Sequence, residues 1–181
     1  MKPGRYEDAI NLLFRCDQTI TLRMNRTLRW RAVCPFFRVV SKLGNGRLWY
    51  GLMIGLAIFH GWYGVQAAIH MGLTALFTLV VYRSIKGYTQ RPRPGAVHDA
   101  IQQGTSALDE YSFPSGHTMH AVAFTLVAST WFPALLLPLW IITLLIAMSR
   151  VILGLHYPTD VVLGALFGTL ISMISLLLVT I

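Results

Sequence analysis

The sequence predicts an all-α integral membrane protein, a helical bundle of five to six transmembrane helices with an N-terminal amphipathic interfacial helix. The first observation is composition: the 181 residues are 55% hydrophobic and 12% charged, with a mean hydropathy of +0.57. Typical soluble domains have about 25% charged residues. The second is a series of apolar stretches near the length of about 20 residues that crosses a bilayer. The third is the segregation of charge between these stretches.

The apolar stretches lie at residues 48–66, 65–85, 117–131, 133–153 and 161–181. The joints at residues 60–66 and 130–135 contain no Lys, Arg, Asp or Glu. Aromatic residues typical of a membrane interface occupy these joints instead: Trp62, Tyr63, Trp131 and Phe132. An up-and-down path therefore places both uncharged joints on one membrane face.

All charged side chains fall on the opposite face of this path. Of the 15 Lys and Arg residues, ten precede residue 48, four lie between residues 83 and 93, and one is Arg150. The positive-inside rule then predicts that this face is cytoplasmic and that a reporter fused after Ile181 lies outside the cytoplasm. The compact chain favours a bacterial inner membrane. The net charge of +8 indicates a membrane surface or an anionic substrate as partner, not nucleic acid.

Residues 1–47 are predicted to form a basic amphipathic arm, and residues 48–181 a transmembrane core. A helical arm has one mainly apolar side, which Asp17 interrupts: Ile10, Leu13, Phe14, Thr21, Met24 and Leu28. Its opposite side carries Arg15, Arg23 and Arg26. We expect the arm to lie on the membrane; an arm packed on the protein without a lipid role is the alternative. Gly44, Asn45 and Gly46 predict a turn into the first span.

Two further patterns are assigned no chemistry. Gly51 with Gly55, and Gly164 with Gly168, have the spacing that lets membrane helices approach closely, so we interpret them as packing positions. Cys16 and Cys34 have no metal or redox spacing and are read as ordinary thiols.

Three polar segments meet on the charged face. KGYTQRPRP, with Lys86 and Arg93, ends the second span, and PSGH at residues 114–117 opens the third. SRVILGLHYPTD, residues 149–160, joins the fourth span to the fifth. Because the spans alternate in direction, segments far apart in sequence are expected to lie together.

The cations in these segments predict a phosphate site. Lys86, Arg93 and Arg150 would repel one another at partial burial, so an anion is expected between them. Phosphate fits best, because arginine binds its oxygens bidentately and lysine adds a point charge. A helix beginning at Pro114 would leave the backbone N–H groups of Ser115 and Gly116 free to bind an oxyanion.

The two histidines supply the chemistry of phosphate ester cleavage. A neutral His156 imidazole can attack phosphorus to form a phosphohistidine, and a protonated His117 can give its proton to the leaving group. Asp160, four residues after His156 in the first turn of a helix, can accept the N–H of the attacking ring. This scheme needs no metal and no other cofactor. Taken singly, each residue has a structural alternative: a helix-terminal charge for Asp160, an interfacial side chain for Arg150, and an interior histidine for His156.

The three segments together resemble the signature of the type 2 phosphatidic acid phosphatase family, whose fold and site are shared with vanadium-dependent haloperoxidases. The pattern K-x6-RP, PSGH, SR-x5-H-x3-D is complete between residues 86 and 160. The resemblance implies that His156 is the nucleophile, Asp160 its orienting partner and His117 the general acid. It also implies a phosphate cradle, formed by Lys86, Arg93, Ser115, Gly116 and Arg150. Many relatives have six spans, whereas this sequence shows five and an arm.

The predicted activity is hydrolysis of a lipid phosphomonoester or pyrophosphate by an integral membrane phosphatase. The predicted site can bind the head group of several lipids: phosphatidylglycerol phosphate, phosphatidic acid, undecaprenyl pyrophosphate and a glycolipid phosphate. A lipid phosphotransferase and a noncatalytic lipid-phosphate binding protein are the alternatives; haloperoxidase activity is disfavoured, because the spans point to a membrane substrate. His120 either lines the pocket or packs between helices, and residues 95–113 form either a lid or a solubilising loop. His60, His70 and His98 are expected outside the site.

Overall fold

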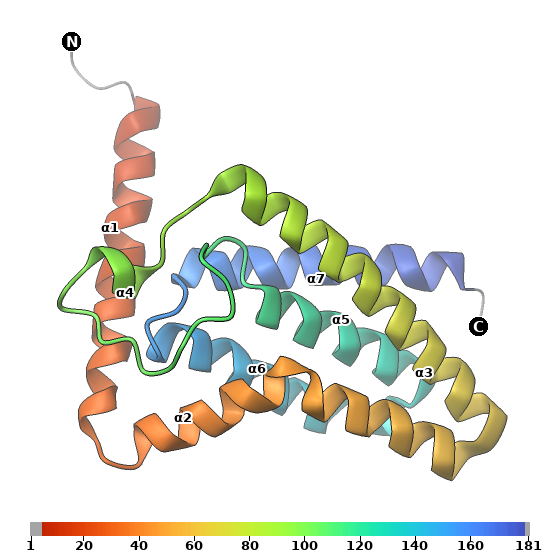
Figure 1. The fold of residues 1–181 in the computed structure, drawn as a ribbon. Helices are drawn as coiled ribbons and strands as arrows, with labels where there is room; N and C mark the ends of the chain where they lie inside the picture. Colours follow the sequence, from red (N-terminus) through yellow and green to blue (C-terminus); the bar gives the residue numbers. More distant parts are fainter. Residues whose placement is uncertain (1–4, 180–181) are drawn as a thin grey trace.

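The computed structural model describes residues 5–179, and every regular element within them is a helix. In chain order the elements are α1 (Arg5–Asn25), η1 (Arg26–Arg29), α2 (Val33–Lys42), η2 (Leu43–Arg47), α3 (Leu48–Thr89), α4 (Pro94–Val97), α5 (Gly116–Trp131), η3 (Pro133–Leu135), α6 (Leu136–Ile152) and α7 (Pro158–Leu178). In Figure 1, α3, α5, α6 and α7 run side by side and α1 crosses one end of the bundle. The all-α prediction is confirmed over the described residues.

Helix α3 is a hairpin of two helical arms and not one straight helix. Gly61 has φ 56° and ψ −137°, a left-handed conformation in which a side chain would be strained. The chain reverses there, as the return of α3 along itself in Figure 1 shows. The turn falls in the uncharged joint at residues 60–66, where the sequence predicted a reversal between two spans.

The first arm of α3 follows a shorter helical segment. α2 leads through η2 into α3, but the chain kinks between them, because Asn45 (ψ 16°) and Gly46 (φ 108°, ψ −28°) are not helical. The turn predicted at Gly44, Asn45 and Gly46 is therefore confirmed, and it lies just before the boundary predicted between residues 47 and 48. Among the described residues, three stretches are long and apolar enough to cross a membrane: Val33–Val97, Pro133–Ile152 and Pro158–Leu178. α5 has 16 residues and is about 24 Å long at 1.5 Å per residue.

Helix α5 lies at the centre of the bundle and packs against α3, α6 and α7. Its contact with α7 depends on two glycines. A Cβ atom added at Gly168 would lie 2.5 Å from the carbonyl oxygen of Met119, and one at Gly164 would lie 2.8 Å from that of Ser115. These glycines therefore allow the close packing that the sequence predicted for them. Gly51 and Gly55 have no neighbour within 4 Å at the corresponding position.

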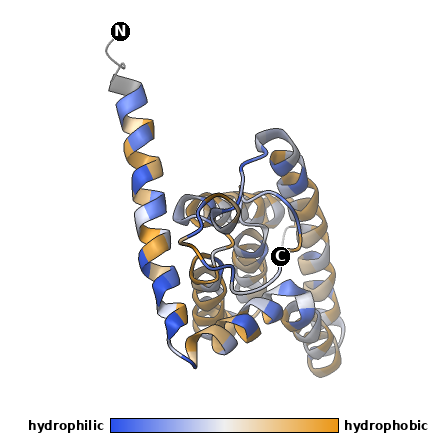
Figure 2. Ribbon diagram, turned by 60° about the vertical axis from the view of Figure 1, so that its left-hand side comes forward, coloured by the Kyte–Doolittle hydropathy of each residue, from blue (hydrophilic) through white to orange (hydrophobic). Residues whose placement is uncertain are grey.

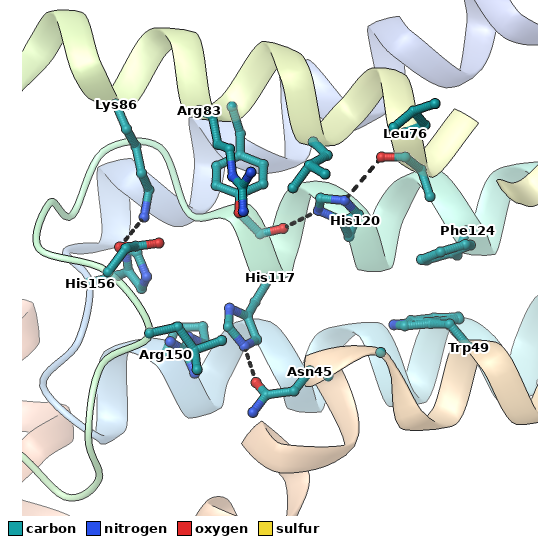
Figure 3. Close-up of a pocket in the computed structure, with 18 of the residues that line it drawn as sticks. Asn45, Trp49, Leu76, Arg83, Lys86, His117, His120, Phe124, Arg150 and His156 are labelled. Carbon is teal, nitrogen blue, oxygen red and sulfur yellow. Dashed lines mark hydrogen bonds and ion pairs between the residues drawn. The ribbon is translucent and has the colours of Figure 1, made fainter. Parts of the chain in front are cut away.

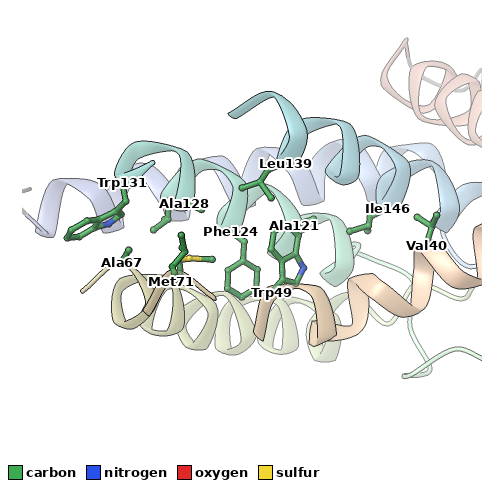
Figure 4. Close-up of a cluster of buried hydrophobic side chains, with 12 residues drawn as sticks. Val40, Trp49, Ala67, Met71, Ala121, Phe124, Ala128, Trp131, Leu139 and Ile146 are labelled. Carbon is green, nitrogen blue, oxygen red and sulfur yellow. The ribbon is translucent and has the colours of Figure 1, made fainter. Parts of the chain in front are cut away.

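The apolar core follows α5 along its length (Figure 4). Trp49 stacks on Phe124, with ring centroids 4.8 Å apart and planes inclined by 16°. Met71, Trp131 and Ile146 extend this cluster between α3, α5 and α6. The packing holds the first turn of α5 beside the ends of α3 and α6, which carry the predicted site residues.

The outer surface of the bundle is also apolar. Large hydrophobic side chains are exposed on α3, α6 and α7, including Phe59, Leu137 and Leu177. Figure 2 shows hydrophobic colouring along the bundle helices and mixed colouring along α1, which stands to one side. Exposed apolar area on this scale marks a membrane or protein contact surface. With helices able to cross a bilayer, it identifies an integral membrane protein.

Candidate active site

Six of the eight predicted site residues, drawn from three separate segments, line one pocket of about 750 Å³; Ser115 and Asp160 do not. Lys86 comes from the end of α3, Arg93 from the residue before α4, and Gly116 and His117 from the first turn of α5. Arg150 comes from the last turn of α6, and His156 from the loop that joins α6 to α7. The polar part of the pocket therefore forms at one end of the bundle, where these elements meet (Figure 3).

His156 is buried and held with one ring nitrogen toward the cations. Its backbone N–H donates to the carbonyl oxygen of Arg150 at 3.1 Å, which fixes the loop against the end of α6. The guanidinium of Arg93 donates to Nε2 at 3.3 Å. Burial, reinforced by the positive charges of Arg150 and Arg93, holds the pKa of His156 well below its usual value. The imidazole is therefore neutral at neutral pH, with the Nε2 lone pair on the side of the pocket.

The other ring nitrogen of His156 faces Asp160. Nδ1 lies 3.7 Å from Oδ2 of Asp160, beyond hydrogen-bond distance, and is a buried polar atom without a partner among residues 5–179. Oδ2 accepts a hydrogen bond from the N–H of Tyr157 at 2.8 Å, which closes the first turn of α7. Asp160 thus lies in the first turn of α7 and also beside His156. Helix α7 begins at Pro158, as the sequence predicted.

Arg91 holds Asp160 from the other side. Its Nη1 lies 2.6 Å from Oδ1 of Asp160, and its Nη2 lies 2.8 Å from Oδ2 of Asp17 in α1. Asp17 also accepts a hydrogen bond from the N–H of Thr159 at 3.0 Å. The aspartate that interrupted the apolar stripe of the predicted arm is therefore the residue that ties α1 to the start of α7.

His117 faces the pocket from α5 and donates through Nε2 to the side-chain oxygen of Asn45 at 2.5 Å. Asn45 is brought there by η2, where the chain passes close to α5. A Cβ atom at Gly44 would lie 3.1 Å from Ile146 and 3.3 Å from the ring of His117, so a small residue is needed at this crossing.

A loop carboxylate occupies the space between two of the cations. Oδ1 of Asp109 lies 2.6 Å from Nζ of Lys86 and 2.5 Å from Nη2 of Arg93. Burial alone would raise the pKa of Asp109, but the hydrogen bonds and charges of Lys86 and Arg93 outweigh it and lower that pKa. Arg150 lies beneath them, where Nη1 donates to the hydroxyl of Ser41 and Nε has no partner among the described residues.

Comparison with known proteins assigns this arrangement to a family. The family model described as "PAP2 superfamily" matches residues 63–180, more than half of the chain. The chain belongs to the PAP2 superfamily.

Curated PAP2 relatives match part of the chain. The lipid A 1-phosphatase of Rhizobium johnstonii is 30% identical over 125 residues, which cover 66% of this chain and 49% of that protein. Phosphatidylglycerophosphatase B of Haemophilus influenzae is 46% identical over 74 residues, covering 35% of this chain and 31% of that protein. The chain thus spans at most about half the length of these curated relatives.

Solved PAP2 structures match nearly the whole fold. The crystal structure of Aquifex aeolicus LpxE aligns with a TM-score of 0.78 and 28% identity, covering 89% of this chain and 94% of that one. A PAP2 type phosphatidylglycerolphosphate phosphatase from Bacillus subtilis aligns with a TM-score of 0.72 over 91% of this chain and 85% of that one. At 22% identity the second likeness shows the fold alone.

Three local expectations about this PAP2 site are wrong. Helix α5 begins at Gly116 with Ser115 as its N-cap, so Pro114 is not in its first turn. Asp160 does not accept a hydrogen bond from the His156 ring, since Nδ1 and Oδ2 are 3.7 Å apart. The N–H of Ser115 is not free for an oxyanion, because it donates to the carbonyl oxygen of Asp160 at 3.0 Å. The Ser115 side chain is fully buried and caps α5 by bonding to Thr118. The expectation for Ser115 overlooked α7, which packs against this turn and supplies the acceptor. Gly116 does line the pocket.

Several PAP2 pocket contacts were not found from the sequence: those of Asn45, Ser41 and Asp109. Asn45 had a signal as the middle residue of a Gly-Asn-Gly turn, but its partner is 72 residues away. Residues 95–113 do not form an isolated loop, since Gly104 pairs with Leu153 and Asp109 lies in the pocket.

The remaining histidines separate as expected. His120 lines the pocket, and its two ring nitrogens lie 2.9 Å and 3.3 Å from the carbonyl oxygens of Gly116 and Ala75, so it also packs between helices. His60, His70 and His98 are not among the residues that line this pocket.

Proposed function

We propose that the chain is an integral membrane lipid phosphatase that cleaves a phosphomonoester or diphosphate through a phosphohistidine intermediate. One observation carries this: a single pocket has cations and two imidazoles at one end and an apolar wall at the other. The apolar wall includes Trp49, Met53, Leu76, Leu79 and Phe124. A phosphate head group and a lipid chain therefore fit one continuous site.

In the proposed first step, Nε2 of His156 attacks phosphorus and the bond from phosphorus to the lipid oxygen breaks. His117 transfers a proton to that oxygen as it leaves. In the second step His117 removes a proton from water, the water oxygen bonds to phosphorus, and the bond to Nε2 breaks to release inorganic phosphate. Asp160 orients the His156 ring from the Nδ1 side, at the 3.7 Å separation described above.

The proposed cradle consists of Lys86, Arg93 and Arg150 with Ser115 and Gly116 at the start of α5. The three cations compensate the charge of the phosphoryl oxygens, and the pocket excludes bulk water from them. Because the N–H of Ser115 is already bonded, its contribution is to hold the turn that presents Gly116. Neither step requires a metal ion or another cofactor.

The names of PAP2 relatives support a lipid phosphate as substrate. They include lipid A 1-phosphatase, phosphatidylglycerophosphatase B and, in Sulfolobus acidocaldarius, undecaprenyl-diphosphatase. These proteins differ in the lipid that they release. The choice among phosphatidic acid, phosphatidylglycerol phosphate, a polyprenyl diphosphate and a glycolipid phosphate therefore depends on the walls of this pocket.

The test is release of inorganic phosphate from a panel of these lipids in detergent with a chelator present and no lipid or sugar acceptor. Hydrolysis predicts free phosphate. A phosphotransferase would release phosphate only when an acceptor is added and would move it to that acceptor. A noncatalytic binding protein would retain the lipid and release none, and this result would overturn the proposal.

We also propose a topology of five spans with α1 as an interfacial arm, in a bacterial inner membrane with the site on the cytoplasmic face. The two arms of α3 count as two spans, followed by α5, α6 and α7. Three apolar side chains of α1, Ile10, Leu13 and Phe14, are exposed. Its protein-facing side is polar and includes Asp17, Thr21 and Asn25. A reporter fused after Ile181 should lie outside the cytoplasm; a cytoplasmic signal would contradict this topology.

Asn45 is expected to act as a positioning residue for His117. Replacing Asn45 by Ala removes the acceptor that holds Nε2 of His117. The imidazole can then move away from the leaving-group oxygen, so kcat should fall about 10- to 100-fold. KM should change little, because Asn45 pairs with His117 and not with the cradle. Asn45→Asp keeps an acceptor and should retain more activity than Asn45→Ala. Steady-state kinetics check this; equal losses in kcat for the two variants would contradict it.

Asp109 is expected to compete with phosphate for Lys86 and Arg93. Asp109→Asn removes the resident negative charge, so inorganic phosphate should inhibit about 3- to 10-fold more strongly, the net effect of one ordinary hydrogen bond. The Ki for phosphate is the measurement. Glu110→Gln is the matched control, because Glu110 is exposed and makes no ion pair within residues 5–179. An unchanged Ki in Asp109→Asn would contradict the competition.

The same ion pairs predict an effect of pH on stability. The pKa of Asp109 is lower in the folded protein than the usual value of about 3.9. Its contribution to the free energy of unfolding is therefore fully present above about pH 4 and is lost as the pH falls through the lowered pKa. As the pH is lowered, the temperature of thermal unfolding should fall less steeply for Asp109→Asn than for the unmodified protein. Parallel curves for the two would contradict this.

A further inference from the structure

Arg83 is a cation in the pocket that the proposed catalytic scheme does not use. It lies three residues before Lys86 on the second arm of α3, so the two side chains leave the same face of the helix. Both line the pocket. Figure 3 shows Arg83 extending from α3 between Lys86 and His120.

Unlike Lys86, Arg91 and Arg93, Arg83 has no counterion among residues 5–179. Lys86 and Arg93 pair with Asp109, and Arg91 pairs with Asp17 and Asp160. Within residues 5–179, no ion pair or side-chain hydrogen bond involves Arg83. The carboxylate of Asp109 supplies an ion-pair partner to Lys86 and Arg93, two cations of the cradle. Arg83 remains available to bind a ligand.

The place of Arg83 along the pocket defines which part of a substrate it meets. Lys86, Arg150 and His156 surround the position of the phosphorus atom at one end, and Phe124 lies at the apolar end (Figure 3). Arg83 is one helical turn from Lys86 toward the apolar end, about 4.5 Å along the axis. It therefore lies on the lipid side of the bond to be broken, where the leaving group begins.

The charges of the pocket favour a substrate with more than one anionic group. Four cations, Arg83, Lys86, Arg93 and Arg150, face the single carboxylate of Asp109. A phosphomonoester carries about 1.5 to 2 negative charges at neutral pH. Such a group and Asp109 together roughly balance the charge of Lys86, Arg93 and Arg150, which leaves Arg83, an exposed side chain, without an anionic partner. A second phosphate in the leaving group would supply that partner.

We propose, on the basis of the proposed function, that Arg83 forms a second anion subsite that binds a phosphate belonging to the leaving group. The preferred substrate is then a lipid whose terminal phosphate is attached to a second phosphate-bearing unit. Two lipid sources share this chemistry: a polyprenyl diphosphate, with directly linked phosphates, and phosphatidylglycerol phosphate, with a glycerol between them. Phosphatidic acid lacks it, because its leaving group is a neutral diacylglycerol.

The test compares kcat/KM for phosphate release from these three lipids in the full chain and in Arg83→Gln. The ratio of kcat/KM for a two-phosphate lipid to that for phosphatidic acid should fall about 10- to 100-fold in Arg83→Gln. The lipid source with the larger fall identifies the better match to the subsite. Arg83→Lys keeps the charge and should restore part of the ratio. Arg26→Gln, which removes an exposed arginine outside the pocket, should leave it unchanged.

A binding measurement separates this subsite from turnover. Inorganic pyrophosphate can reach both anion positions, whereas inorganic phosphate fills one. The ratio of their Kd values, measured by calorimetry, should move toward weaker pyrophosphate binding in Arg83→Gln. Unchanged ratios in both experiments would overturn the subsite while leaving the proposed function intact. A protein that releases phosphate from none of the three lipids would overturn the proposed function and the subsite with it.

Discussion

Replacing His156 by Ala is expected to lower phosphate release at least about 10³-fold, since removal of a catalytic nucleophile abolishes the covalent route. The loss follows from geometry: His156 presents an Nε2 lone pair to the cradle, and no other imidazole is placed against Arg93 in the described part of the chain. Enzyme incubated with a lipid carrying labelled terminal phosphate should form a labelled protein, and His156→Ala should not. Phosphate release and covalent labelling are the two measurements.

His60→Ala is the matched control for this loss. His60 is exposed at the opposite end of the bundle and packs on Phe132, so its removal should leave turnover unchanged. Turnover that survives in His156→Ala would contradict the assignment of the nucleophile.

The lowered pKa of His156 also predicts a pH profile. Protonation would remove the attacking lone pair, so kcat/KM should fall only well below pH 6.5, the usual value for histidine. A fall centred at or above pH 6.5 that can be assigned to His156 would contradict its buried, neutral state.

Replacing Arg150 by Met is expected to give the second largest loss, about 10²- to 10³-fold in kcat, the effect of removing one donor from an oxyanion site. Arg150 is buried at the base of the cradle, and its Nε has no protein partner. Because Arg150 lines the pocket, this nitrogen is available to a phosphoryl oxygen bound there. Arg150→Lys should restore little of the activity, because a lysine cannot form the paired hydrogen bonds of a guanidinium.

Stability should change in the opposite direction to activity. A buried cation without a counterion in contact costs free energy of folding, and an apolar side chain of similar length removes this cost. Thermal unfolding of Arg150→Met should therefore occur at the same temperature as for the unmodified protein or above it. A variant that is inactive because it unfolds early would show that Arg150 supports the fold instead of the phosphate.

The part of the site that could be predicted from the sequence was predicted from the positions of the apolar spans. Their lengths impose an alternating path through the bilayer, and an alternating path brings Lys86, His117 and Arg150 to the same end whatever the details of packing. Local rules sufficed for the start of α7, because Pro158 fits the first turn of a helix and Asp160 caps it. The reversal at Gly61 followed from the uncharged joint around it.

The missed contacts join residues far apart in the chain through side chains that have no distinctive local pattern. Asn45 and His117 are 72 residues apart, and Asp17 and Arg91 are 74 apart. Asp17 was expected to disturb an apolar stripe, but α1 turns this residue toward the bundle. The expectation that the N–H of Ser115 is free was wrong for the same reason. Its acceptor comes from α7, which is far away in the sequence and could not be inferred from the residues around Ser115.

The amino-acid sequence alone determined the helical class, the membrane setting and the identity of the groups that meet at the charged end, because hydrophobic length and charge position act over short stretches of chain. Only the tertiary structure decided which partner each of those groups has. Hydrogen bonds and ion pairs need side chains within about 3 Å of each other. Such distances arise only when α1, η2, the loop before α5 and the start of α7 pack together at the same end of the bundle, so Asn45, Asp109 and Asp17 acquire their roles from packing.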